Sequence, residues 1–476
     1  MRLFKIFLFI FISFLLTSCK NNSSASQSEE IAMPTEIPLF KNEHIVLDDS
    51  VAYYSKICNK PSFQFLIPVD INNDSFQDFI AHFWCDSNTP TQISYENVQD
   101  ILIAYLSDGF GNYVVDNLTV FGELYPKLGG ASRKYSRGDI NKDGRDDFAF
   151  AMNAEDGRAA YDNETILTNY AYPAVLLSRD SGYEIFNIGY KDWGHSVQIK
   201  NDEVLFGGHN SQAYKFFNSS WIDISENYDE LSFASFLVFD EFIINSVRKN
   251  SKQGLELVKE NKIISAVLKE EVFKVFFESW NNAGTGKYEE LGVYEYKGKY
   301  FFHGMTSEMC RKDDVIVATI NASIPIDREI IENEYYSQNE TTPIIFFTFY
   351  KIENETLKEE DILITGEKIN HNFNFFDCFD INQDNKKDIV AHVFSQSWNN
   401  ESENNKGVPE IYINLNNEEY YNLNTSNWPI YSTDDDTQGY LHDIDNNGTQ
   451  DLVMYPLKAN HSAIVEIYLS NRNLSE

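Results

Sequence analysis

The sequence predicts an all-β fold, a β-propeller of about seven four-stranded blades. Two observations lead to this prediction. An acidic nine-residue loop occurs four times between apolar, strand-like runs, and each time a second apolar run with a polar turn follows it. The spacing of these elements repeats along the chain, which is typical of architectures in which each repeat is one structural unit.

All four acidic loops follow one rule: an oxygen-bearing side chain stands at positions 1, 3, 5 and 9. We number them loops 1 to 4; they are DINNDSFQD (70–78), DINKDGRDD (139–147), DINQDNKKD (380–388) and DIDNNGTQD (443–451). Each loop offers three carboxylates and one amide, a ligand set that suits a hard cation such as Ca²⁺. Neither His nor Cys occurs in any of them, which disfavours a transition metal.

We expect about four structural Ca²⁺ ions, one per loop, held by these side chains and by the backbone carbonyl at position 7. Side-chain identity at position 7 is free, and its occupants are unrelated. The predicted ligands are Asp70, Asn72, Asp74, Phe76 and Asp78; Asp139, Asn141, Asp143, Arg145 and Asp147; Asp380, Asn382, Asp384, Lys386 and Asp388; and Asp443, Asp445, Asn447, Thr449 and Asp451.

Position 6 of each loop must turn sharply, which favours a glycine because positive φ carries no Cβ penalty there. Gly144 fits this expectation, and Ser75 departs from it. An EF-hand needs a bidentate Glu at position 12 and flanking helices, and no loop has either. The alternative to a metal site is that Asp, Asn and Gly simply form turns between strands.

On these residues the loops resemble the calcium-binding repeats of the FG-GAP/VCBS class, found in the β-propellers of integrin α subunits and in many bacterial surface proteins. The resemblance implies a four-stranded blade that carries Ca²⁺ in an early hairpin loop. It covers four segments of the chain and says little about residues 226–345.

A second signal completes each blade, an alternating strand followed by a turn and an aromatic residue. It occurs at residues 103–113, 174–183 and 411–420 and at the C-terminus. Asp139 follows Asp70 by 69 residues, and Asp443 follows Asp380 by 63. Two pairs of blades therefore bracket a divergent middle.

The ends of the chain favour a closed ring. The last repeat stops after its third strand, and the apolar stretch at 44–54 precedes the first repeat as an unassigned strand. An N-terminal strand that completes the last blade protects both edges of the ring. About 430 residues at about 60 per blade give seven blades.

The divergent middle has a less regular pattern. Residues 196–222 and 290–320 resemble degenerate blades without acidic loops, whereas 251–276 fits either a helix or two strands. An inserted subdomain is the alternative to a regular blade there. We therefore expect blades with loops 1 and 2 over 44–225, the middle over 226–345, and blades with loops 3 and 4 over 346–476.

The N-terminus predicts a lipoprotein. Residues 1–18 combine Arg2 and Lys5 with a short apolar run, as in a signal peptide. The LTSC segment that ends at Cys19 resembles a lipobox, which implies lipidation of Cys19 and membrane attachment. Lys20 in place of Asp points to the outer membrane, and 19–43 is expected to be a flexible tether. An ordinary secretory signal with a chance Cys is the alternative.

Charge and cysteine content restrict the partners and the compartment. The net charge of −35 excludes nucleic acid and an anionic lipid surface as electrostatic partners. Four cysteines remain after Cys19, and they allow three disulfide pairings. A bridge between Cys58 and Cys85 is favoured because these residues flank loop 1.

No motif for a nucleophile or a phosphate loop occurs. His82 and His392 occupy equivalent repeat positions, either as a pair facing a channel or as independently packed side chains. We assign no catalytic residue and expect a cell-envelope binding module for a carbohydrate or a protein. The alternatives are a polysaccharide lyase or hydrolase, and a periplasmic assembly or scaffold lipoprotein.

Overall fold

The computed structural model is built from β-strands, as predicted. The residues that it describes are 40–47, 61–85, 99–109, 112–128, 131–153, 171–192, 194–208, 210–228, 235–280, 286–296, 299–302, 305–312, 315–326, 335–337, 344–364, 372–379, 381, 388–394, 410–414, 420–422, 428, 437–445, 447, 449–456 and 465–470. The predicted signal peptide, Cys19 and Cys58 lie outside them. In this part of the chain the helices are α3 (Asn117–Phe121) and the 3₁₀ turn η4 (Ser225–Tyr228), and no helix is long and apolar enough to span a bilayer.

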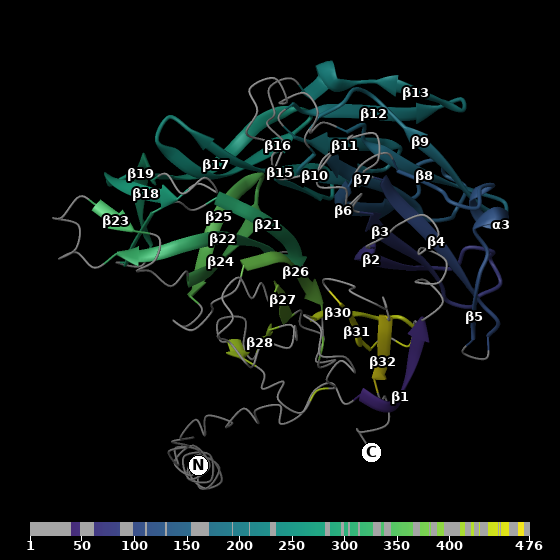
Figure 1. Ribbon diagram of the computed structural model, residues 1–476. Coiled ribbons are helices and arrows are strands. Elements are labelled where there is room, and N and C mark those ends of the chain that lie inside the picture. Colours follow the sequence, from purple (N-terminus) through teal and green to yellow (C-terminus); the bar gives the residue numbers. More distant parts are fainter. Residues whose placement is uncertain are drawn as a thin grey trace, which may run out of the picture. The chain divides into compact units, whose positions relative to one another are not determined.

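Four sheets in the first half of the chain are antiparallel meanders of four strands (Figure 1). Blade 1 comprises β2 (Pro61–Val69), β3 (Asp78–Cys85), β4 (Gln99–Ser107) and β5 (Tyr113–Val115). Blade 2 comprises β6 (Ala131–Gly138), β7 (Asp147–Asn153), β8 (Ala174–Arg179) and β9 (Gly182–Asn187). Blade 3 comprises β10 (Ser196–Lys200), β11 (Glu203–Gly207), β12 (Gln212–Phe217) and β13 (Ser220–Asp223). Blade 4 comprises β14 (Phe236–Phe239), β15 (Phe242–Lys249), β16 (Lys252–Lys259) and β17 (Lys262–Glu270).

Three further blades come from residues 305–470, together with one N-terminal strand. Blade 5 comprises β21 (Met305–Lys312), β22 (Val315–Ile326), β24 (Ile344–Glu353) and β25 (Thr356–Ile364). Blade 6 comprises β26 (Asn372–Phe379), β27 (Asp388–Phe394), β28 (Glu410–Asn414) and β29 (Tyr420–Asn422). Blade 7 comprises β30 (Thr437–His442), β31 (Asp451–Pro456), β32 (Val465–Ser470) and β1 (Phe40–Leu47).

The two ends of the described chain meet in blade 7. Strand β1 pairs antiparallel with β32, and Ile45 lies opposite Ile467 (Figure 1, purple beside yellow). An N-terminal strand thus completes the last blade, as predicted. It begins at Phe40, so residues 40–43, which we expected in the tether, belong to this strand.

Blade 5 carries an extension, so its sheet has eight strands. The extension comprises β18 (Phe273–Trp280), β19 (Gly286–Tyr296), β20 (Lys299–Phe302) and β23 (Tyr335–Ser337). Strand β22 joins the two parts, because its first residues pair with β21 and β24 and its last residues pair with β20. Residues 290–320 therefore do not form a blade by themselves. They are divided between the extension and blade 5.

The ambiguous segment at 251–276 forms strands rather than a helix. It contains all of β16 and β17, which complete blade 4, and the start of β18. Asn250 and Ser251 form one turn and Glu260 and Asn261 the next, all with positive φ. Such two-residue hairpin turns match the twist of the strands that they join. Turn residues, rather than periodicity, decide the structure here.

The core consists of layers between neighbouring sheets. Leu66 of β2 packs with the blade 7 residues Val453 and Ile467, whereas the adjacent Ile67 packs with Phe148 of blade 2. Similar clusters lie between blades 2 and 3, 3 and 4, and 4 and 5. Contacts also join blades 5 and 6, 6 and 7, and 7 and 1. This closed order of seven sheets is a β-propeller.

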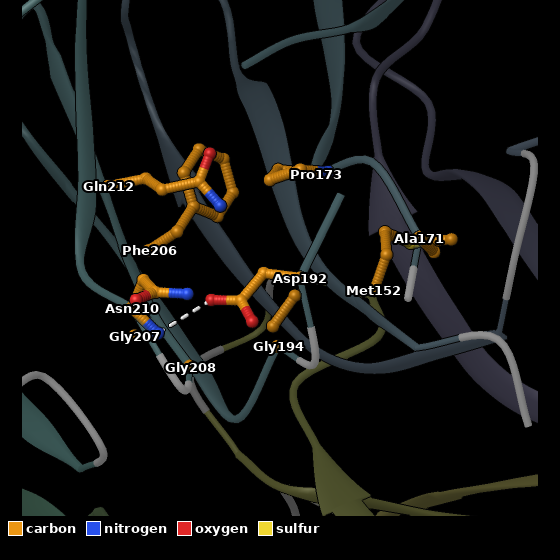
Figure 2. A pocket seen from close by; sticks show the side chains of 11 residues that line it. Met152, Ala171, Pro173, Asp192, Gly194, Phe206, Gly207, Gly208, Asn210 and Gln212 are labelled. Atoms are coloured by element: carbon orange, nitrogen blue, oxygen red, sulfur yellow. Dashed lines mark hydrogen bonds between the residues drawn. The ribbon is translucent and has the colours of Figure 1, made fainter. Parts of the chain in front are cut away.

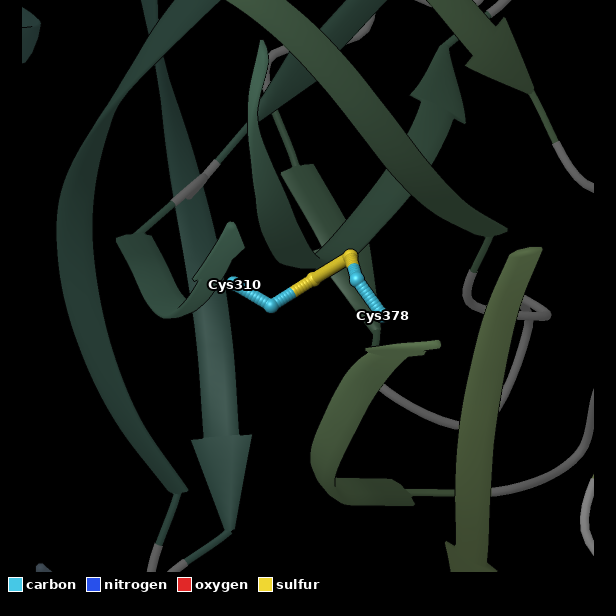
Figure 3. Close-up of a disulfide and its surroundings, with 2 residues drawn as sticks. All are labelled: Cys310 and Cys378. Atoms are coloured by element: carbon cyan, nitrogen blue, oxygen red, sulfur yellow. A yellow bond between two sulfur atoms is a disulfide. The ribbon is translucent and has the colours of Figure 1, made fainter. Parts of the chain in front are cut away.

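A disulfide links blades 5 and 6 (Figure 3). Cys310 of β21 and Cys378 of β26 are both buried, and their Cα atoms are 5.8 Å apart. Of the three pairings that four cysteines allow, this one is compatible with the bridge that we favoured between Cys58 and Cys85. That second bridge stays a prediction.

We predict that removal of β1 destabilises the propeller. A chain that starts at residue 48 leaves β32 as an unpaired, apolar edge, which favours aggregation. Its melting temperature should fall by about 5 °C or more. A chain that starts at residue 37 keeps β1 and is the control. Equal melting temperatures for the two chains would contradict the role of β1 in closure.

We also predict that the double substitution Cys310→Ser/Cys378→Ser lowers the free energy of unfolding by about 4 kcal/mol, because the bridge closes a long loop. The two cysteines are 68 residues apart. Denaturant unfolding with and without a reductant measures the effect. Any reductant response that the double variant retains reports on Cys58 and Cys85. An unchanged unfolding midpoint would refute a stabilising bridge.

Candidate calcium loops

Each acidic loop joins the first and second strands of a blade. The hairpins close at Asp in position 9, which opens the second strand and pairs with the last residue of the first. The pairs are Val69 with Asp78, Gly138 with Asp147, Phe379 with Asp388 and His442 with Asp451. The predicted strand-loop-strand arrangement is therefore present in blades 1, 2, 6 and 7.

The Asp at position 9 is fully buried in all four loops. Its Oδ2 accepts the N–H of the Ile at position 2, at 2.9 Å in loop 1, 2.6 Å in loop 2, 3.0 Å in loop 3 and 2.8 Å in loop 4. Burial raises the pKa of Asp78 and of Asp147, and these backbone bonds partly oppose it. The Asp at position 9 therefore holds the backbone of its own loop by a hydrogen bond, and it is also a candidate ligand.

A serine at or next to the end of the third strand donates a second backbone hydrogen bond to the Asp at position 9. The N–H of Ser178 donates to Oδ1 of Asp147 at 2.6 Å, and Ser107 and Ser470 do the same for Asp78 and Asp451 at 2.7 Å. Sequence reasoning missed these serines. A signal was present, because the dipeptide Leu-Ser lies at or next to the end of the third strand in each of these three blades.

In loops 1 and 2, positions 1, 3 and 5 face the loop's own backbone. Oδ1 of Asp139 accepts the N–H of Asp143 at 3.0 Å, and Oδ2 accepts that of Gly144 at 3.0 Å. Asp143 in turn accepts the N–H of Arg145 at 2.9 Å and is contacted by the hydroxyl of Ser178 at 3.0 Å. Loop 1 repeats this pattern, with Asp70 accepting from Asp74 and Ser75.

The turn at position 6 has the predicted positive φ, +84° at Gly144 and +71° at Ser75. Position 4 also has positive φ, +60° at Lys142 and +61° at Asn73, which sequence reasoning missed. Asn tolerates this region well, whereas Lys does so at a cost. Two left-handed residues per loop bend the chain around a common centre.

Loop 4 brings its acids closest together. One carboxylate oxygen from each of Asp443, Asp445 and Asp451 lies within 4.8 Å of the others, and this is the one such group among the residues that the structure describes. Burial, and then the charges of Asp445 and Asp443, raise the pKa of Asp451 to about 6. The site therefore concentrates negative charge. The side-chain Oδ1 of Asn447 accepts the N–H of Thr449 at 2.7 Å.

Loop 3 falls mostly outside the described residues. This holds for Asp380, Asn382, Asp384 and Lys386, so their predicted roles stay predictions. Asp388 is fully buried, like its counterparts in the other loops. At position 7 of loop 1, Phe76 is exposed and lies against Gly109, where a Cβ would meet its ring at 2.6 Å.

In blades 3 and 4, which lack an acidic loop, basic side chains neutralise Asp202 and Asp240 in the corresponding turns. Asp202 of blade 3 pairs with Lys142 at 2.9 Å and Lys215 at 3.0 Å. Burial alone would raise the pKa of Asp202, but the two ammonium groups outweigh it and lower that pKa. Asp240 of blade 4 pairs with Arg311 at 2.7 Å.

The candidate ligand carboxylates of loops 1 and 2 lack such basic partners, although Asp146 at position 8 of loop 2 pairs with Arg137. In the described part of the chain, none of their candidate ligand carboxylates forms an ion pair with Lys or Arg; these carboxylates are Asp70, Asp74, Asp78, Asp139, Asp143 and Asp147. Their oxygens accept backbone N–H groups instead. The candidate ligand sites of loops 1 and 2 therefore carry uncompensated charge that the corresponding turns of blades 3 and 4 do not.

A pocket lies at the opposite end of the sheets, between blades 2 and 3 (Figure 2). It has a cavity volume of about 10 Å³ and is lined by Met152, Phe206, Gly194, Gly207 and the buried Asp192, among others. The Asp192 carboxylate points toward Asn210, whose N–H donates to it at 2.8 Å. A cavity of this volume holds about one water molecule, so the pocket does not enclose a ligand.

His82 is fully buried, and its ring lies 6.2 Å from that of Phe150 in blade 2. This supports independent packing rather than a pair of histidines facing a channel. The repeat equivalence itself is real, because His82 lies opposite Phe65 and His392 opposite Phe375, each beside a register shift in the first strand.

No family model matches the chain, and no curated protein matches its sequence. Solved structures give distant matches. BamB from Moraxella catarrhalis is 8% identical with a TM-score of 0.34, covering 87% of this chain and 99% of that one. Rhamnogalacturonan lyase YesW is 13% identical with a TM-score of 0.37, covering 86% and 72%. YCF48 bound to D1 peptide is 10% identical with a TM-score of 0.28, covering 72% and 93%.

With scores this low, these structures carry no argument about function, and the propeller assignment rests on the sheet pairing of the chain itself. The FG-GAP/VCBS resemblance stays a prediction from the loop residues.

We predict that Asp147→Ala destabilises the protein with or without a divalent cation. The substitution leaves the buried N–H groups of Ile140 and Ser178 without their acceptor, which costs about 2–4 kcal/mol in total. Urea unfolding in calcium and in chelator measures this. Ser178→Ala retains the backbone N–H and is the matched control, with a smaller effect. A loss for Asp147→Ala seen only in calcium would show that the carboxylate is a ligand alone.

Proposed function

We propose that the protein is a calcium-stabilised β-propeller that serves as a binding module of the cell envelope. The observation that carries the calcium assignment is the contrast between turns. Asp202 in blade 3 and Asp240 in blade 4 have Lys or Arg partners, whereas the candidate ligand acids of loops 1 and 2, at positions 1, 5 and 9, have none in the described part of the chain. A bound cation supplies the missing positive charge.

The donor set fits Ca²⁺. Loop 4 gathers three carboxylate oxygens in one place, and every predicted ligand atom in the four loops is an oxygen. When bound, the ion neutralises carboxylates that otherwise repel one another and fixes the hairpin. The ligands would be positions 1, 3, 5 and 9 with the carbonyl at position 7. Extracellular modules of this kind bind Ca²⁺ with Kd of about 10⁻⁴–10⁻³ M.

We place the ligand-binding surface at the end of the sheets away from the acidic loops. That end carries the connections between second and third strands and between blades, and it holds the pocket beside Asp192. Connecting loops on a rigid scaffold are where binding residues concentrate. The small pocket favours a carbohydrate or protein bound across the loops rather than a small molecule enclosed in a cavity.

The pocket does not favour the lyase or hydrolase hypothesis. Its acid, Asp192, is buried and accepts the N–H of Asn210, as a structural carboxylate does. The assembly or scaffold hypothesis remains compatible with the fold, because propellers host many functions. Attachment to the outer membrane through Cys19 rests on the lipobox-like sequence.

The experiment that tests the calcium proposal is a thermal melt of a soluble chain starting at residue 20, with millimolar calcium and with chelator, together with a count of bound metal. We expect a large rise in melting temperature and about four bound ions, one per acidic loop. An unchanged melting temperature and no bound calcium would show that the acidic loops are turns without a metal.

Single substitutions locate the ions. Asp143→Ala should lower the melting temperature in calcium and have little effect in chelator, because position 5 is an exposed ligand rather than a buried tether. Asp445→Asn should remove one ion from the count, since it disperses the acidic cluster of loop 4. Asp180→Asn, in the exposed turn between β8 and β9, is the control and should change neither result. Equal effects of Asp143→Ala in both conditions would exclude a metal-dependent role for that residue.

A further inference from the structure

Loops 1 and 2 are connected by an arginine. Nη2 of Arg145, at position 7 of loop 2, donates to the backbone carbonyl oxygen of Ile71, at position 2 of loop 1, at 2.5 Å. The two residues are 74 positions apart and belong to neighbouring blades. In a chain with 38 basic and 73 acidic residues, a guanidinium committed to a carbonyl rather than to a carboxylate needs an explanation.

Both ends of this contact lie inside the candidate metal shells. The N–H of Ile71 donates to Oδ2 of the buried Asp78, so Ile71 positions a ligand of loop 1. The N–H of Arg145 donates to Asp143, and its carbonyl is a predicted ligand of loop 2. Ile71 in loop 1 and Arg145 in loop 2 therefore each contact a candidate ligand of their own loop and also contact the other loop.

A second arginine also connects blade 2 to blade 1, close to the first strand's end where loop 1 begins. Arg137, at the end of β6, donates to the carbonyl oxygen of Pro68, near the end of β2, and lies 3.6 Å from Asp146. Its guanidinium also stacks over the Phe148 ring at 5.4 Å. Blade 2 therefore contacts the start of loop 1 twice, through Arg137 at Pro68 and through Arg145 at Ile71. Only the Arg145 contact joins a residue of one loop to a residue of the other.

We propose that Arg145 couples the two loops, so that calcium bound in one raises the affinity of the other. This inference rests on the proposed calcium function. An ion in loop 2 fixes the backbone of Arg145, and the guanidinium then holds Ile71, and through it Asp78, in the arrangement that binds an ion in loop 1. Such coupling is reciprocal, and values of about 5-fold to 150-fold are typical.

Four proteins test the proposal: the wild-type soluble chain, Asp74→Asn, Arg145→Gln and the double variant. Calcium titration calorimetry gives the ion count and the stepwise Kd values, and loops 3 and 4 are unchanged throughout. With Arg145 present, Asp74→Asn should remove one ion and weaken loop 2 by about 5-fold or more. In the Arg145→Gln background, Asp74→Asn should still remove one ion but leave loop 2 unchanged.

Two further variants separate coupling from general damage. Arg145→Lys keeps a donor for the Ile71 carbonyl and should restore part of the coupling. Arg179→Gln removes a guanidinium of the same blade that pairs with Glu184, and it should leave the coupling at the wild-type value. Circular dichroism in chelator checks that all variants are folded.

The outcomes are distinct. Loss of coupling in Arg145→Gln with the calcium count of that variant unchanged supports the proposal. The same coupling with and without Arg145, or none in the wild-type chain, overturns it while leaving the calcium function intact. A wild-type chain that binds no calcium overturns both.

Discussion

A carboxylate buried at the start of the second strand ties three strands of a blade together. In blades 1, 2 and 7, the position 9 Asp accepts one N–H from the loop that follows the first strand and another from the end of the third. Burial of a carboxylate raises the free energy of the folded state unless hydrogen bonds or a cation compensate its charge. The rest of the loop, with its further acids at positions 1, 3 and 5, surrounds this fixed point.

The blades depend on one another as much as on their own hydrogen bonds. Adjacent residues such as Leu66 and Ile67 enter different core layers, one toward blade 7 and the other toward blade 2. The sheets of blades 1 to 4 are therefore apolar on both faces, and each needs two neighbours. This explains why closure by β1 and the cross-links between blades matter to the whole chain. The disulfide between Cys310 and Cys378 and the Arg145 contact are two such cross-links.

Most of the fold was predictable because the repeated loops fix both strand order and register. The Asp at position 9 and the third-strand signals located three of the strands in blades 1, 2, 6 and 7. The middle was harder, since blades 3 and 4 replace the acidic loop with two-residue turns and ion pairs. The extension on blade 5 was not recognisable because one strand, β22, pairs with β21 and β24 near its start and with β20 at its end.

For the candidate site, the sequence identified ligand positions but not the contacts between loops. The serines that bond to the Asp at position 9 come from a strand 19 to 31 residues further along the chain, as Ser107 does for Asp78. The reach of Arg145 to Ile71 depends on how blades 1 and 2 pack, which a motif within one loop does not encode.

The position of β1 has a mechanical consequence. If the chain is attached to a membrane at Cys19, as we propose, any pull between the membrane and a ligand on the propeller enters the fold at Phe40. The ladder between β1 and β32 then bears the load before any other part of the protein. The strand that closes the ring is also its attachment point, so tension on the anchor acts directly on closure.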